Sequence, residues 1–204
     1  TARNTKNEIK SFPLVEMEFN QEANLVERLI CPSNESVKTH EKAKMLAEKY
    51  LGKEDPVYAD ISGNLANLYS DMQEFQQSES LHLEVLNIRK KVLTKDHPDY
   101  AMSLGNLANF YHKIGQSEKA EPLYIEAMEI IEKKIGKKNT VYALHQNNLS
   151  TCYIDLKQYE KAKALLLESK ILHEQLYGSA HPKMATILLN QTILSWKQHQ
   201  YKAA

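Results

Sequence analysis

This sequence has few cysteines and no net charge, and both features limit the kinds of protein it can be. The 204 residues contain two cysteines, Cys31 and Cys152, which lie far apart and lack metal-ligand spacing. A disulfide framework is therefore not expected, and a reducing compartment such as the cytoplasm fits better. The 26 basic and 26 acidic residues cancel. Nucleic acids and anionic membranes both attract surplus positive charge, so neither is expected as a partner.

Long apolar runs and catalytic signatures are missing as well. No run approaches the roughly 18–20 apolar residues of a membrane span. The sequence has no Gly-rich phosphate loop, no Gly-x-Ser-x-Gly and no His-Glu-x-x-His, and its eight histidines are scattered. We therefore expect no catalytic residues, no metal site and no cofactor. The first residue is Thr1 rather than Met, and no signal peptide follows, so we expect a fragment or a processed product.

What the sequence does contain is a period of 42 residues, marked by asparagine at Asn64, Asn106, Asn148 and Asn190. A fixed period of this length predicts a solenoid, in which each unit packs only on its neighbours. Within a unit, two segments carry apolar residues at spacings of three and four, which predicts two helices. A short turn separates them, and Gly115 suits the end of the first helix in one such turn. The predicted fold is an all-α solenoid of antiparallel helix pairs.

The period divides the chain without gaps. We predict repeat units at 57–98, 99–140 and 141–182, a partial unit or capping helix at 183–204, a degenerate capping helix pair at 14–56 and a polar tail at 1–13. The unit junctions include Asp96-His97-Pro98 and Ala180-His181-Pro182, and proline is tolerated at the first position of a helix. We therefore expect His97 and His181 in junction turns rather than in catalysis. Small residues are expected where paired helices cross, at Ala66, Ala108, Ser150, Ser78, Ala120 and Ala162.

Three segments carry a resemblance to a known family. They are Asn106-Leu107-Ala108-x-x-Tyr111, Ala120-Glu121-Pro122-Leu123-Tyr124-x-x-Ala127 and Gly178-x-x-His181-Pro182. They resemble tetratricopeptide repeats, in the 42-residue variety of kinesin light chains and many bacterial multidomain proteins. The resemblance covers 57–204 well and 15–56 weakly. It implies a right-handed superhelix whose first helices line a concave groove that binds a protein or peptide partner.

Asparagines dominate the groove that this resemblance implies. A carboxamide both donates and accepts, so a row of them suits a peptide backbone, with apolar pockets supplying specificity. Asn64, Asn106 and Asn148 could equally bond neighbouring helices, whereas the irregular set of Asn67, Asn109 and Asn147 is expected to contact ligand. The whole predicted partner-binding set is Asn64, Asn67, Met102, Asn106, Asn109, His112, Lys113, Asn147, Asn148, Asn190 and Trp196.

Two glycines of the same face are also expected to serve the ligand. Gly63 and Gly105 lack a Cβ and would let a ligand approach the helix closely. A C-terminal carboxylate is not the expected ligand, because the family positions that would need cations hold Asp60, Met102, Leu144 and Thr186. The groove is not basic either, so we expect an internal peptide segment.

These features predict a non-catalytic interaction module, such as a scaffold or adaptor. Two alternatives stay open. The repeats could regulate a larger bacterial enzyme, such as a caspase-like protease or an ATPase, or recruit its substrate. They could also self-associate through the unpaired helix at 183–198, where we expect Ile187, Leu188 and Leu194 to be exposed.

Overall fold

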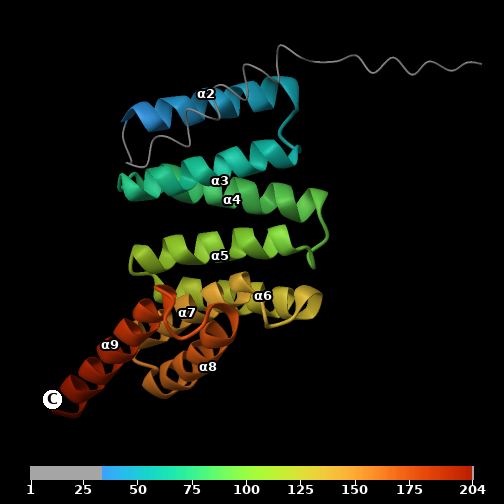
Figure 1. Cartoon of the computed structure of the whole chain (residues 1–204). Helices are drawn as coiled ribbons and strands as arrows, with labels where there is room; N and C mark the ends of the chain where they lie inside the picture. Colours follow the sequence, from blue (N-terminus) through green and yellow to red (C-terminus); the bar gives the residue numbers. More distant parts are fainter. Residues whose placement is uncertain (1–33, 204) are drawn as a thin grey trace, which may run out of the picture.

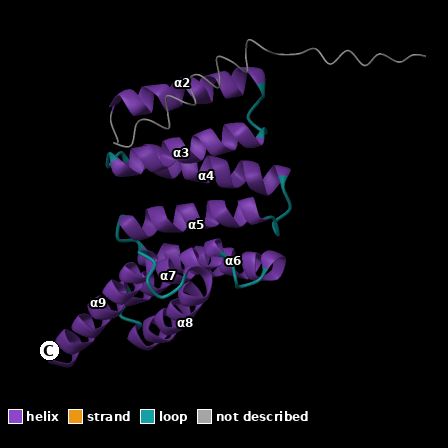
Figure 2. Ribbon diagram, in the orientation of Figure 1, coloured by secondary structure: helices purple, strands orange, loops and turns teal. Residues whose placement is uncertain are grey.

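The structure, a computed structural model, describes residues 34–203 as a stack of helices without strands (Figures 1 and 2). The predicted tail and the first helix of the degenerate pair lie outside the described residues. The described helices are α2 (Asn34–Tyr50), α3 (Pro56–Asp71), α4 (Phe75–Val92), α5 (Pro98–Lys113), α6 (Ser117–Ile135), α7 (Thr140–Asp155), α8 (Tyr159–Tyr177) and α9 (Lys183–Ala203). The starts of α3, α5 and α7 follow the 42-residue period.

Side chains at the junctions cap the first helices of the pairs. Asp55 accepts a hydrogen bond from the Val57 backbone N–H at 2.8 Å, and Asn139 accepts one from Tyr142 at 2.8 Å. His97 Nδ1 accepts from the Asp99 N–H at 3.1 Å. An N-terminal turn leaves backbone donors without partners, and these side chains supply acceptors. The prediction that His97 occupies a junction turn is confirmed, and His181 Nδ1 likewise accepts from the Lys183 N–H at 3.2 Å.

The turns inside the pairs place one residue in the left-handed region at the same repeat position. These residues are Gln73 (φ 65°), Gly115 (φ 77°) and Lys157 (φ 59°). Only glycine adopts this conformation without a steric cost. The backbone geometry therefore repeats more strictly than the sequence does.

Small residues allow the paired helices to cross closely, as predicted. Ala66, Ala108 and Ser150 on the first helices have no exposed surface, and neither do their partners Ser78, Ala120 and Ala162. Ser78 Oγ also donates to the Ala66 carbonyl at 2.8 Å, which satisfies a polar group in this dry contact. The main core runs through α5 to α9 and includes Tyr124, Ile131 and Leu166.

The array curves toward the first helices of the pairs. Helices α3, α5, α7 and α9 each contact the next one in this series, whereas α4, α6 and α8 make no such contacts with one another within residues 34–203. Helices that stand closer together lie on the inside of a curve. We call the exposed side of α3, α5, α7 and α9 the inner face.

Helix α9 packs on α7 and α8 and differs from expectation in what it exposes. Ile187 is 1% exposed and Leu194 is 4% exposed, and both belong to the main core. The expectation that these two residues are exposed is therefore wrong, because they fill the contact with the preceding pair. Leu188 is exposed as expected, and Trp196 is 56% exposed.

Candidate functional site

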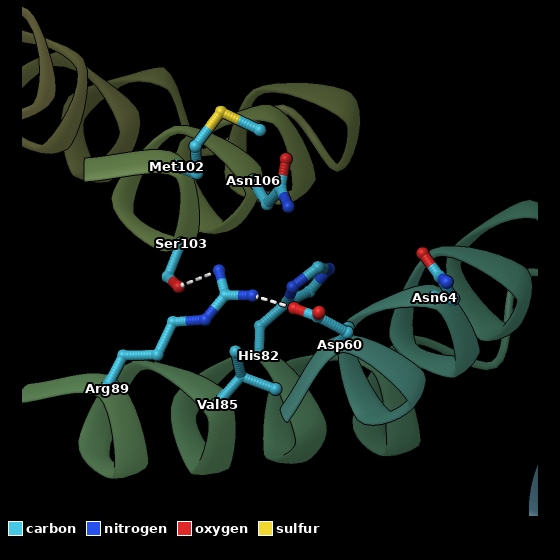
Figure 3. A pocket seen from close by; sticks show the side chains of 9 residues that line it. Asp60, Asn64, His82, Val85, Arg89, Met102, Ser103 and Asn106 are labelled. Atoms are coloured by element: carbon cyan, nitrogen blue, oxygen red, sulfur yellow. Dashed lines mark hydrogen bonds and ion pairs between the residues drawn. The ribbon is translucent and has the colours of Figure 1, made fainter. Parts of the chain in front are cut away.

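A pocket opens on the inner face between α3 and α5, with α4 beneath it (Figure 3). Its volume is about 300 Å³. This lies at the lower end of the range of roughly 300–1,000 Å³ for ligand pockets and suits a single side chain. The lining residues are Asp60, Gly63, Asn64, His82, Val85, Arg89, Met102, Ser103 and Asn106. Three of the predicted partner-binding residues, Asn64, Met102 and Asn106, are thus brought together.

The pocket exists because two side chains are small where the next pair of helices has large ones. Tyr124 stands 42 residues after His82, and His145 stands 42 residues after Ser103. The rings of Tyr124 and His145 lie 6.3 Å apart, and both residues are buried, so the corresponding space between α5 and α7 is filled. Between α3 and α5 the smaller His82 and Ser103 leave that space open.

The two inner-face glycines differ in the same way, since the space beside Gly105 is filled and the space beside Gly63 is open. A Cβ built on Gly105 would stand 2.0 Å from Cε1 of His145, so the imidazole packs directly on the helix backbone. The expectation that Gly105 admits a ligand is therefore wrong, since the chain's own histidine occupies the place. A Cβ on Gly63 would meet nothing within 4 Å. Close approach of a ligand at Gly63 stays a prediction.

His82 brings a buried polar atom without a partner to the pocket. The residue is 2% exposed, and no described residue forms a hydrogen bond with its Nε2. Its ring lies 5.7 Å from that of Phe110. Burial disfavours the charged form and lowers the pKa of His82 to about 4, so the ring is neutral at pH 7. Buried polar atoms in folded proteins usually have a hydrogen-bond partner, and among the described residues the two ring nitrogens of His145 also lack one.

An ion pair closes one side of the pocket. Arg89 of α4 donates from Nη1 to Ser103 Oγ at 2.9 Å and to the Asp99 carbonyl at 3.0 Å, and from Nη2 to Asp60 (Figure 3). The pocket is therefore polar but carries no unbalanced charge among these residues. Arg89 was not among the predicted site residues because it belongs to a second helix. The sequence did carry a signal for Arg89. The residues one and two periods after it are Ile131 and His173, so Arg89 departs from the repeat.

Four of the predicted asparagines bond neighbouring first helices. Asn148 Nδ2 donates to Asn109 Oδ1 at 2.8 Å, and Asn190 Nδ2 donates to Asn147 Oδ1 at 3.0 Å. Asn109 Oδ1 also accepts from the Tyr124 hydroxyl at 2.5 Å. The irregular Asn109 and Asn147 therefore accept from the regular Asn148 and Asn190, which gives both sets a role in stacking. Contact of these four residues with a ligand stays a prediction.

The remaining three asparagines hold available carboxamides. Within the described part of the chain, the side chains of Asn64, Asn67 and Asn106 have no hydrogen-bond partner. Asn64 and Asn67 are exposed, and Asn106 is half-buried. Asn67 matches Asn109 in the repeat, but His82 stands in place of the tyrosine whose hydroxyl bonds Asn109. The same smaller residue that opens the pocket therefore also leaves Asn67 free.

Polar and charged residues of the inner face bond one another along the array. Lys113 Nζ lies 2.6 Å from Asp71 Oδ1 and also donates to the Ser70 carbonyl at 3.1 Å. His112 Nε2 lies 2.8 Å from Asp155 Oδ2. The predicted residues His112 and Lys113 are thus engaged with neighbouring first helices. Trp196, the remaining predicted residue, is exposed on α9, at the other end of the described stack from the pocket.

Clusters of metal ligands and membrane-spanning helices are not found in the part of the chain that the structure describes. Within residues 34–203, no group of three or more His, Cys, Asp or Glu side chains could hold a metal ion. None of the described helices combines the length and the apolar character needed to cross a membrane.

Comparison with known proteins connects these features to one family. The family model described as tetratricopeptide repeat matches residues 58–133 and 140–204. No curated protein sequence matches the chain.

Several solved structures share the fold. A kinesin light chain of P. anserina with nearly identical TPR-like repeats has a TM-score of 0.71 at 23% identity, covering 91% of this chain and 88% of that one. BtubC (BKLC) from P. vanneervenii has a TM-score of 0.77 at 20% identity, covering 92% and 76% of the two chains. The apo form of RapI has a TM-score of 0.66 at 18% identity, covering 93% of this chain and 50% of that one.

Proposed function

The chain belongs to the tetratricopeptide repeat family, and from this membership we propose that it is a protein–protein interaction module whose inner face binds a segment of a partner. Repeats of this family generally mediate protein–protein interactions. We propose a non-catalytic scaffold or adaptor role in the cytoplasm, a reducing compartment that suits the free thiol of Cys152. The bound segment is an internal stretch of peptide, extended or helical.

The observation that carries this proposal is the group of available carboxamides on α3 and α5. Asn64, Asn67 and Asn106 lack partners among the described residues and have solvent-accessible side chains, so their carboxamides are available to a ligand. An extended peptide presents alternating N–H and C=O groups, and a carboxamide pairs with both. Met102, which is 37% exposed beside them, offers an apolar contact that adapts to different side chains.

Charge on the inner face supports a neutral segment. Lys113 is paired with Asp71, His112 with Asp155, and Arg89 with Asp60. To reach Lys113 or Arg89, a strongly acidic peptide would have to displace the carboxylate that each of them already binds. Charge complementarity therefore favours a segment of low net charge over an acidic one or a C-terminal carboxylate.

A displayed library of random twelve-residue peptides tests the proposal. Peptides selected on the full chain are synthesised, and their affinities are measured by calorimetry for the wild type and for the double variant Asn64→Ala/Asn106→Ala. Each lost hydrogen bond costs roughly 0.5–1.5 kcal/mol, so the double variant should bind about 5- to 150-fold more weakly. The matched control is Asn87→Ala, which removes an exposed asparagine from α4 on the other side of the array.

Two results would overturn the proposal. One is a library that yields no peptide with saturable binding. The other is selected peptides whose affinity is unchanged in the double variant, or falls equally in Asn87→Ala. Circular dichroism spectra and thermal midpoints of all variants show whether the fold is intact, because the altered side chains form no hydrogen bond with the described residues.

A further inference from the structure

We infer that the pocket between α3 and α5 is a subsite that receives the imidazole ring of a histidine on the bound partner. The inference deepens the proposed function and rests on it, since it names the side chain that the inner face selects. The chain itself shows how such a ring would sit.

His145 is the internal example of how such a ring packs, although both of its nitrogens lack a hydrogen-bond partner among the described residues. Its ring lies in the space between α5 and α7, against the backbone at Gly105, where no Cβ keeps it away. Gly63 presents the same bare backbone one period earlier, and nothing stands within 4 Å of where its Cβ would be. The inner-helix residue that would supply the ring there is Ser103, whose side chain is too short. A partner's imidazole can therefore take the place that a histidine of this chain takes in the next pair.

His82 supplies the polar partner. His82 lines the pocket, its Nε2 is buried and unpaired among residues 34–203, and Figure 3 shows its ring beside the Arg89–Asp60 pair. A neutral imidazole has one N–H donor and one nitrogen acceptor. An incoming neutral imidazole therefore pairs with His82 whichever nitrogen of His82 carries the proton. A phenylalanine ring fills the space but leaves the buried nitrogen without a partner.

The direction of entry distinguishes an imidazole from a phenol. The chain's own phenol in the equivalent space, Tyr124, comes from the second helix α6 beneath, and its hydroxyl reaches Asn109. The ring on the inner-helix side, against the glycine, is the imidazole of His145. A partner on the inner face approaches from the inner-helix side. A charged carboxylate is disfavoured, because Asp60 is exposed at the rim and Arg89 is already bonded to it.

Single amino-acid probes test the subsite apart from peptide binding. N-acetyl-histidine methylamide is titrated into the ¹⁵N-labelled full chain at pH 7.5, where an imidazole with a pKa of about 6.5 is mostly neutral. Saturable shifts are expected at the backbone amides of Gly63, Asn64 and Asn106 at millimolar concentrations. The matching phenylalanine and tyrosine compounds should bind at least fivefold more weakly.

Two variants separate filling of the pocket from pairing with its nitrogen. Gly63→Leu places a side chain in the pocket, starting from a Cβ that meets nothing within 4 Å, and should weaken histidine binding at least tenfold. His82→Phe keeps a buried ring but lacks the nitrogen, so the histidine and phenylalanine compounds should then bind within twofold of each other. Asn87→Leu on α4 is the matched control for Gly63→Leu and should change neither affinity.

The inference is overturned by any of three results. They are absence of a saturable shift with the histidine compound, equal binding of the tyrosine or phenylalanine compound to the wild type, and unchanged binding in Gly63→Leu. Failure of the proposed function looks different. Library peptides whose affinity does not depend on Asn64 and Asn106 refute binding at the inner face, even when the histidine compound binds. Peptides whose affinity does depend on those residues support it, even when the histidine compound does not bind.

Discussion

Alanine at position 105 should destabilise the protein, although the same change at position 63 should stabilise it. Both glycines lie inside first helices, at equivalent repeat positions. Glycine in a helix interior is about 1 kcal/mol less favourable than alanine, so alanine gains this amount wherever its Cβ has room. Gly63 has that room, but at Gly105 the Cβ would stand 2.0 Å from Cε1 of His145.

The magnitude follows from how little His145 can move. The residue is 2% exposed and lies against Tyr124, which is itself fully buried. Forcing extra volume into such a contact costs about 1–3 kcal/mol, and an overlap this deep belongs near the upper end. After the propensity gain is subtracted, Gly105→Ala should lose about 2 kcal/mol, while Gly63→Ala gains about 1 kcal/mol.

Urea unfolding followed by circular dichroism measures both variants against the wild type. With m values of about 2–3 kcal/mol per M, the two midpoints should differ by about 1 M or more. The double variant Gly105→Ala/His145→Ala supplies the control. Once the ring is removed, alanine at 105 should stabilise the His145→Ala background, which a double-mutant cycle reports as coupling. Stabilisation by Gly105→Ala in the wild type would refute this account of the contact.

Three further changes in stability follow from the structure. Burial lowers the pKa of both His82 and His145 from 6.5 to about 4, so the unfolded chain takes up protons first as pH falls below 6.5. Stability should therefore decline between pH 6.5 and 4, by about 2 kcal/mol per histidine at pH 5 relative to pH 7.5, and urea midpoints of His82→Phe should show a shallower decline. Lys157→Gly should raise the thermal midpoint, because a side chain in the left-handed region costs about 1–2 kcal/mol, and an unchanged or lower midpoint would show that the turn is not strained. Asn190→Ala should cost about 1–3 kcal/mol in chemical denaturation, since it leaves the buried Asn147 carboxamide unpaired, and a loss below 0.5 kcal/mol would argue against this bond.

Much of the fold was predictable because the features that define the repeat are local in the sequence. Helical spacing, capping residues at the junctions and small residues at the crossings each act over a few neighbouring positions. For this reason the predicted helix pairs, the turn roles of His97 and His181, and the crossing residues around Ala108 agree with the structure. The exposure of Ile187 and Leu194 was mispredicted, because it depends on how α9 packs on the pair before it.

The candidate site was less predictable, because it lies between units. Asn64, Met102 and Asn106 were predicted from their repeat positions and do line the pocket. Arg89 and His82 come from the second helix and were not predicted, since the resemblance pointed to first helices alone. Both residues break the repeat, and that departure was the available signal.

The sequence by itself determined the period, the helix pairs and the polar character of the inner face. These properties follow from spacing and composition, which need no knowledge of distant contacts. Only the tertiary structure decided which polar side chains hydrogen-bond a neighbouring helix and which remain available to a ligand. Asn109 is bonded by the Tyr124 hydroxyl and by Asn148, whereas its repeat equivalent Asn67 faces the shorter His82 and stays without a partner among the described residues. The same differences fill the space at Gly105 and leave it open at Gly63.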